Sequence, residues 1–272
     1  MPNFSFNGKK VYYETHGEGK PLMLLNGIMM STKSWTIFKD AFSHQNRLIL
    51  LDFLDQGQSE KMSEPYTQDL QVEVVKALID ELGYDRVNIL GISYGGEVAL
   101  NFITKYEEMV DRLVLFNTTY RTSPWLKDIG DAWNLSRDNA MDYYLTTIPV
   151  IYSPKFYNEN RKWMEDRKKL LTDTVFSNKD FMDSMVRLTI SAETHDVTEA
   201  LKGIKTRTLI VSSENDFITP KEEQGALHRL LVNSDYVMIP ETGHGSMYEQ
   251  PALFTALTLG YVNASDLTMS VL

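Results

Sequence analysis

The sequence predicts an α/β fold, a mostly parallel eight-stranded sheet with helices on both faces and a helical cap insertion. Short apolar runs alternate with helical patterns, as in sheets whose strands are buried on both faces. This alternation stops between residues 120 and 199, where no strand run is clear and the pattern is mainly helical. We therefore expect a single domain, with a core formed by residues 1–119 and 200–272 and a cap formed by residues 120–199.

The strands are predicted from short apolar or alternating segments. Asn7-Gly8 separates alternating residues 4–6 and 10–13, and this dipeptide favours a two-residue turn between paired strands. We therefore expect an N-terminal hairpin. Continuous apolar runs predict the other strands, at residues 22–25, 48–51, 87–90, 113–116, 208–211 and 236–239.

Helices are predicted where apolar residues recur at helical spacing. Such stripes cover residues 67–82, 94–106 and 252–261. Thr219 and Pro220 are typical of an N-cap followed by a first helical residue, and they predict another helix after them.

The inserted segment differs from the core in composition. It holds Trp125, Trp133 and Trp163, which are three of the four tryptophans, together with several tyrosines and methionines. Apolar side chains usually pack against one another, so we expect most of these to form the cap's own core. Some must face the site if the insertion covers it.

Composition and charge exclude several classes of protein. The chain has 272 residues, no cysteine and a formal net charge of −10. Disulfides, thiolate metal sites and a cysteine nucleophile are therefore excluded. An acidic chain repels phosphate backbones, so we expect no nucleic-acid partner. The N-terminus has no apolar signal region, and no stretch approaches the roughly 20 apolar residues of a membrane span, so we expect a cytoplasmic protein with no membrane partner.

The strongest chemical signal is the segment Gly91-Ile92-Ser93-Tyr94-Gly95. It matches Gly-x-Ser-x-Gly and lies directly between an apolar strand and a helical pattern, which is the context of a nucleophile elbow. Such a sharp turn strains the serine backbone and lifts its hydroxyl above the sheet edge, and the flanking glycines leave room for the turn. Ser93 is therefore the candidate nucleophile.

A serine nucleophile needs an adjacent base, and His244 is the best candidate among five histidines. It lies in a glycine-flanked loop after the predicted strand 236–239, and loops at the carboxyl ends of strands form the site in open α/β sheets. His195, at the end of the insertion, is a distant second choice. His16, His44 and His228 lie in polar segments typical of the surface.

Asp216 is the candidate acid because it follows the strand 208–211 by a short loop and completes the order Ser, Asp, His. Glu214 is the rival carboxylate. The alternative acid position, after the preceding strand, holds Asn117-Thr118-Thr119, none of which carries a negative charge.

Two backbone N–H groups are expected to form an oxyanion hole. Tyr94 follows the nucleophile and supplies one, and Ile28, after the tight turn at Gly27, supplies the other. Met29, Trp125 and Met247 are our candidates for substrate contacts, because flexible methionines and cap aromatics can shape a tolerant apolar pocket.

With these residues in place, the chain resembles the α/β-hydrolase superfamily with an inserted cap, over essentially its full length. Two positions depart from its pattern. The superfamily usually has His-Gly where this chain has Asn26-Gly27. The difference removes a side chain that supports the loop of residues 26–30, which carries the candidate donor Ile28 and is called the oxyanion loop below. The superfamily's Asp-x-x-Gly-x-Gly-x-Ser pattern corresponds to residues 52–59, where Asp55 replaces the first glycine and can alter the site entrance or its polarity.

The resemblance implies hydrolysis of a small or medium, fairly apolar acyl substrate through an acyl-enzyme on Ser93, without metal or cofactor. A carboxylic ester is the leading substrate class. A thioester or lactone is the nearest alternative, and a non-catalytic ligand-binding scaffold is a less favoured one. Dehalogenases and epoxide hydrolases of this fold use an aspartate nucleophile. Carbon–carbon bond hydrolases usually carry a tryptophan soon after the histidine, where this chain has Gly245-Ser246-Met247-Tyr248.

Overall fold

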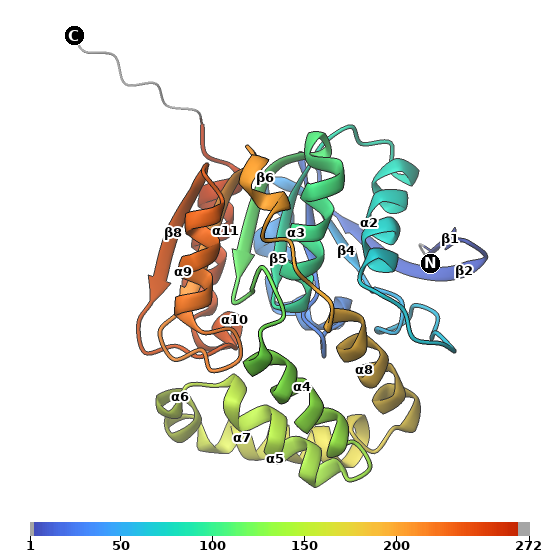
Figure 1. The fold of residues 1–272 in the computed structure, drawn as a ribbon, viewed down its shortest axis with the longest axis vertical. Helices are drawn as coiled ribbons and strands as arrows, with labels where there is room; N and C mark the ends of the chain where they lie inside the picture. The colour runs from blue at the N-terminus through green and yellow to red at the C-terminus, as the bar shows by residue number, and fades with distance from the viewer. Residues whose placement is uncertain (1–2, 266–272) are drawn as a thin grey trace.

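A computed structural model describes residues 3–265 and contains one eight-stranded sheet (Figure 1). The strand order is β1-β2-β4-β3-β5-β6-β7-β8. Two neighbouring pairs, β1–β2 and β2–β4, are antiparallel, and all the other neighbouring pairs are parallel. The predicted fold class is therefore confirmed. The strands are β1 Asn3–Phe6, β2 Lys9–His16, β3 Lys20–Leu25, β4 Asn46–Leu51, β5 Val87–Ile92, β6 Val110–Phe116, β7 Arg207–Ser213 and β8 Ser234–Ile239.

The predicted hairpin is present as β1 and β2, with Phe6 paired to Lys9 across the turn. Asn7 and Gly8 have φ angles of 50° and 77°, and two left-handed residues are what a two-residue hairpin turn requires. The ends of the predicted core, residues 1–2 and 266–272, lie outside the described residues.

Helices cover both faces of the sheet, and neighbouring residues of each central strand point to opposite faces. Met23 and Leu25 pack with α2 (Asp69–Glu81), α3 (Tyr94–Tyr106) and α9 (Lys221–Leu230). Leu22 and Leu24 pack on the other face. The elements there are η1 Thr32–Phe38, α1 Lys39–Ser43, α10 Ser246–Glu249 and α11 Pro251–Val262. Burial on both faces explains why these strands read as continuous apolar runs.

The segment between β6 and β7 forms a separate group of helices. Figure 1 shows it on the side to which the β6 and β8 arrowheads point. Its apolar core includes Trp133, Tyr144 and Met182, as expected. Trp125 and Trp163 differ from the expectation, because they are 57% and 38% exposed. Its helices are α4 Pro124–Leu135, α5 Ala140–Ile151, α6 Pro154–Glu159, α7 Arg161–Leu170, η3 Leu171–Val175 and α8 Lys179–Ala192. The short turns η2 Glu107–Met109 and η4 Ala200–Gly203 belong to the core.

One local prediction was wrong. The helix after Asp216 begins at Lys221 with Pro220 as its N-cap, so Thr219 lies one residue before the cap. The reason is that the Thr219 hydroxyl donates to Asp216 Oδ2 at 2.9 Å instead of capping the helix. Within residues 3–265, no helix has both the length and the apolar character that crossing a membrane requires.

Candidate active site

Ser93 occupies the turn between β5 and α3. Its φ and ψ angles are 52° and −124°, a sparsely populated conformation for a residue with a side chain. The turn also needs its glycines: a Cβ on Gly91 would lie 2.7 Å from the Gly95 carbonyl oxygen, and one on Gly95 would lie 2.2 Å from that of Leu25. The Thr118 hydroxyl donates to the Ser93 carbonyl at 2.8 Å and holds the elbow from the adjacent loop.

The structure brings Ser93, His244 and Asp216 together. His244 Nε2 lies 2.9 Å from Ser93 Oγ, and His244 Nδ1 lies 3.0 and 2.9 Å from the two Asp216 carboxylate oxygens. An ionised carboxylate only accepts hydrogen bonds, so Nδ1 carries the proton and Nε2 is free to accept the serine hydroxyl proton. This is the arrangement of a nucleophile, a base and an orienting acid.

Asp216 is buried, yet its surroundings favour the charged form. Burial raises the pKa of its carboxyl, but the charge and hydrogen bond of His244, together with bonds from Thr219 and Asn117, outweigh burial and hold the pKa below its ordinary value. The Ile218 and Thr219 backbone N–H groups donate to Oδ1 at 2.9 Å each. Asn117 Nδ2 donates to Oδ2 at 2.9 Å, so the alternative acid position supplies a donor to the acid.

The rival residues are engaged elsewhere. Glu214 accepts a hydrogen bond from the Glu241 backbone N–H at 2.8 Å. His195 is buried, accepts from Asn101 at Nδ1 (3.0 Å) and donates from Nε2 to the Thr119 carbonyl (3.1 Å). Burial lowers the pKa of His195 to about 4, so it is neutral at pH 7.

The loop that carries His244 is attached to the cap. The Gly245 N–H donates to the Ile151 carbonyl at 2.8 Å. Glu249 accepts from the Gly243 N–H at 3.1 Å and from the Ser153 N–H and hydroxyl at 2.8 and 2.6 Å. Sequence reasoning missed Glu249, since no local pattern marks it, and only the fold brings it to the cap.

The two candidate oxyanion donors belong to segments next to Ser93. Tyr94 is the first residue of α3, where a helical N–H has no partner within the helix. Ile28 follows Gly27, and a Cβ built on Gly27 would lie 3.6 Å from the Cβ of Ser93. Both N–H groups therefore belong to segments that border the Ser93 side chain.

The Asn26 departure does not leave the oxyanion loop without side-chain support. The Asn26 side chain is fully buried, and its Nδ2 donates to the Leu51 carbonyl at 2.7 Å. Its Oδ1 accepts from the Trp35 indole N–H at 2.6 Å. The expected loss of support was wrong, because the amide bonds to both neighbouring segments.

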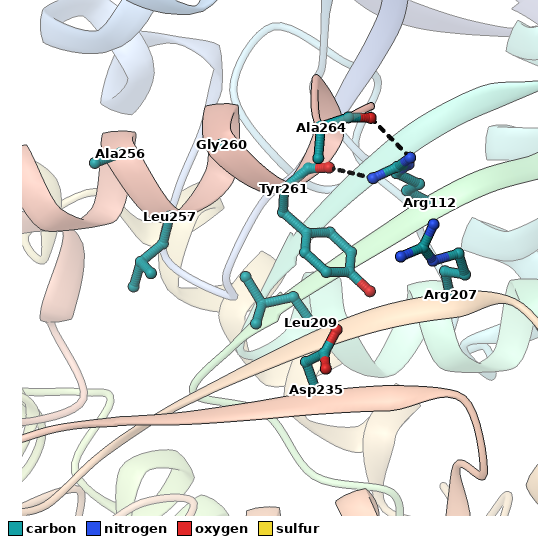
Figure 2. Close-up of a pocket in the computed structure, with 9 residues that line it drawn as sticks. All are labelled: Arg112, Arg207, Leu209, Asp235, Ala256, Leu257, Gly260, Tyr261 and Ala264. Atoms are coloured by element: carbon teal, nitrogen blue, oxygen red, sulfur yellow. Dashed lines mark hydrogen bonds between the residues drawn. The ribbon is translucent and has the colours of Figure 1, made fainter. Parts of the chain in front are cut away.

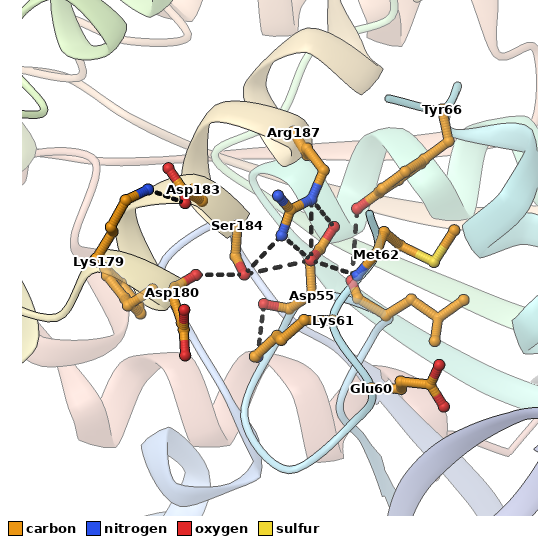
Figure 3. A network of polar contacts seen from close by, with 12 residues as sticks. Asp55, Glu60, Lys61, Met62, Tyr66, Lys179, Asp180, Asp183, Ser184 and Arg187 are labelled. Atoms are coloured by element: carbon orange, nitrogen blue, oxygen red, sulfur yellow. Dashed lines mark hydrogen bonds and ion pairs between the residues drawn. The ribbon is translucent and has the colours of Figure 1, made fainter. Parts of the chain in front are cut away.

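The Asp55 departure connects the core to the cap (Figure 3). Asp55 has a φ of 74°, which explains why a glycine suits this position. Its carboxylate is buried and accepts from Arg187 of α8, at 2.7 Å from Nη2 and 3.1 Å from Nε. The Ser184 hydroxyl and Met62 N–H also donate to it.

The three candidate substrate contacts lie in different environments. Met29 is half-buried and packs against the cap core. Trp125 is 57% exposed, and its indole N–H donates to the carbonyl of Phe217, the residue after Asp216, at 2.8 Å. Met247 is buried in the core cluster that contains Trp35 and Phe254, an environment that favours a packing role.

A hollow elsewhere on the molecule does not belong to this site (Figure 2). It is lined by residues near the amino ends of β6 to β8 and the end of α11, including Arg112, Arg207 and Tyr261. Arg112 donates to the carbonyls of Tyr261 and Ala264, at 2.8 and 2.9 Å, and so caps the carboxyl end of α11.

Comparisons with known proteins place the chain in a family. Residues 20–145 match the family described as alpha/beta hydrolase fold, and residues 182–264 match the family described as TAP-like protein. The curated relative "Putative carbamate hydrolase RutD" of Caulobacter sp. is 23% identical, over 93% of this chain and 96% of the relative.

Two solved structures have similar folds. MGS-M2, an alpha/beta hydrolase enzyme from a Medee basin deep-sea metagenome library, is 49% identical with a TM-score of 0.97, covering 99% of this chain and 100% of its own. The esterase EaEST from Exiguobacterium antarcticum has a TM-score of 0.82 at 21% identity, covering 96% and 98%. The chain belongs to the α/β-hydrolase superfamily.

Proposed function

We propose that this protein is a serine hydrolase that cleaves a carboxylic ester of a small or medium apolar substrate. The observation that carries the proposal is the continuous hydrogen-bonded series from Ser93 Oγ through His244 to Asp216. The strained elbow directs the Ser93 hydroxyl toward His244, and the ionised acid fixes the tautomer in which the histidine accepts a proton.

The reaction would proceed through an acyl-enzyme. Ser93 Oγ attacks the ester carbonyl carbon while His244 Nε2 takes the hydroxyl proton, and the Ile28 and Tyr94 N–H groups stabilise the oxyanion. The intermediate collapses, and His244 gives the proton to the departing alcohol. Water, deprotonated by His244, then attacks the acyl carbon and releases the acid, which restores the Ser93 hydroxyl. Asp216 stays ionised throughout.

The apolar substrate class is supported by what surrounds the oxyanion loop. Ile28 and Met29 pack against the cap core, whose buried members include Ile148 and Phe176. Ile218, two residues after Asp216, belongs to the same cluster. A charged substrate group would lose water here without a compensating partner, whereas an alkyl or aryl acyl group would gain burial. We propose Met29 and Trp125 as the more accessible of the predicted contacts.

A fluorophosphonate followed by intact-mass measurement tests the nucleophile. Wild-type protein should gain one adduct, the Ser93→Ala variant none, and Ser5→Ala, which changes an exposed serine of β1, should be labelled like wild type. An unlabelled wild type, or an adduct that persists in Ser93→Ala, would refute the assignment.

Turnover assays separate the substrate classes. A series of p-nitrophenyl esters of increasing chain length reports activity and pocket depth together. Matched ester, thioester and lactone substrates then rank the alternatives, since the same three residues serve all of them. Stoichiometric ligand binding without turnover, unchanged by Ser93→Ala, would instead support the non-catalytic scaffold.

A further inference from the structure

Gln56 reaches from the loop after β4 to the loop that carries the candidate oxyanion donor. It is 2% exposed, and its Nε2 donates to the carbonyls of Gly27 (2.9 Å) and Ile28 (3.2 Å). Its Oε1 accepts from Asn26 Nδ2 at 3.0 Å. Both ends of one buried side-chain amide are therefore used on three consecutive residues of the oxyanion loop.

The bond to Gly27 has a direct consequence for the Ile28 N–H. The Gly27 carbonyl and the Ile28 N–H belong to one planar trans peptide, so they point in opposite directions. Holding the carbonyl therefore fixes the direction of the N–H. The Met30 N–H donates to the same carbonyl at 3.1 Å. Glycine has the greatest backbone freedom, so rotation of this peptide is restrained mainly by such bonds.

The hydrogen-bonding partners also settle which way each amide faces. The Trp35 indole can only donate, so the Asn26 atom that it contacts at 2.6 Å is the oxygen Oδ1. Asn26 Nδ2 must then face Gln56, whose facing atom is Oε1. Gln56 Nε2 is left to face the Gly27 carbonyl. The indole N–H of Trp35 thus determines which atoms donate and which accept in the hydrogen bonds from Trp35 through Asn26 and Gln56 to the Gly27 carbonyl.

We propose that Gln56 is the positioning residue of the oxyanion hole, which aims the Ile28 N–H at the carbonyl oxygen of the substrate. The inference rests on the proposed ester hydrolysis at Ser93. Gln56 itself touches no reacting atom. It acts through the Gly27–Ile28 peptide, and Asn26 and Trp35 hold its amide in the orientation that donates.

The first test replaces Gln56 by methionine, which has a similar length and no donor. Loss of a complete oxyanion donor lowers kcat by about 100- to 1000-fold, so a misdirected donor should lower it by roughly 10- to 100-fold. KM should stay within about twofold of wild type, because the oxyanion forms only in the transition state. A trifluoromethyl ketone that matches the acyl group should lose affinity by the same factor as kcat/KM.

Gln58→Met is the matched control, since it makes the same change at an exposed position two residues away in the same loop. It should leave all three measurements unchanged. If Gln56→Met keeps kcat/KM within twofold of the control, the inference is overturned. A general structural disturbance would raise KM, and it would weaken binding of the product acid as much as binding of the ketone. That result would also overturn the inference.

Gln56→Glu provides a second test, which can be used even if the methionine variant folds poorly. A protonated carboxyl keeps one donor for the Gly27 carbonyl, whereas the ionised form has none and repels the carbonyls. The ratio of kcat/KM between Gln56→Glu and wild type should therefore fall as the pH rises, and a flat ratio would overturn the inference. Absence of any ester turnover or Ser93 adduct in wild type would instead overturn the proposed function and this inference together.

Discussion

The ion pair between Asp55 and Arg187 offers a quantitative test of how the cap is attached. The Asp55 side chain is fully buried and that of Arg187 is 15% exposed. Two substitutions break the same pair from opposite sides. Arg187→Met keeps the length of the side chain but removes its charge, and Asp55→Gly restores the residue that the superfamily pattern has at this turn.

The two changes should differ in cost. Removing one partner of a buried ion pair costs about 3–5 kcal/mol because the other charge stays buried. Arg187→Met leaves the Asp55 carboxylate in the interior with the Ser184 and Met62 donors, so we expect a loss near the lower limit, about 3 kcal/mol. Asp55→Gly leaves a long guanidinium that can reach water, and it relieves a φ of 74°, which recovers about 1 kcal/mol. The net loss of unfolding free energy in Asp55→Gly should therefore be about 1 kcal/mol.

Urea unfolding of the wild type and both variants measures the difference. Arg161→Met is the control, since it breaks an exposed ion pair with Glu165 on the neighbouring helix α7 and should leave the free energy of unfolding nearly unchanged. Asp55→Gly at least as destabilising as Arg187→Met would show that the turn, rather than the buried charge, dominates. A loss in Arg187→Met no larger than in the control would refute the reasoning.

Three further predictions concern a buried acid and the candidate catalytic loop. Burial raises the pKa of Glu97 from 4.5 to about 7, so the folded protein holds a proton that the unfolded chain releases, and the free energy of unfolding should fall by up to about 3 kcal/mol as the pH rises from 4.5 to 7. Urea unfolding of Glu97→Gln should lack this contribution, and identical pH slopes would contradict it. His244→Ala should lower kcat by several orders of magnitude in an ester assay, and near-normal turnover would identify another base. Gly243→Ala should unfold at a lower temperature in calorimetry, because its Cβ would lie 2.5 Å from the Ser153 backbone nitrogen, and an unchanged Tm would show that the loop can shift.

Much of the fold could be predicted because its determinants are local. The Asn7-Gly8 turn and the apolar strand runs depend on neighbouring residues, and the elbow motif fixes its own strand and helix. Thr219 shows where local reasoning fails: its hydroxyl could cap a helix, but a carboxylate three residues earlier takes it instead. Competition of this kind is decided by burial, which the local pattern does not contain.

The partners of the candidate site residues could not be predicted, because they come from distant parts of the chain. Asn117 and Asp216 are 99 residues apart, and Asp55 and Arg187 are 132 apart. Without covariation between sequences, a single chain gives no signal for such pairs. The sequence did mark Asn26 and Asp55 as departures from the superfamily pattern, and both make buried polar contacts that the usual histidine and glycine could not make in the same way.

If the proposed function holds, these contacts imply that the cap influences the proposed catalysis. The Asp216 loop is held through Phe217 to Trp125 of α4, and the His244 loop is held through Glu249 to Ser153. Gln56 follows Asp55, whose partner Arg187 belongs to α8. Three loops at or beside the proposed site, those that carry Asp216, His244 and Gln56, therefore each have a hydrogen-bonded connection to a different part of the cap. Since a small misplacement of catalytic groups costs far more in rate than in binding, changes at these cap contacts should lower kcat even where no cap residue touches the substrate.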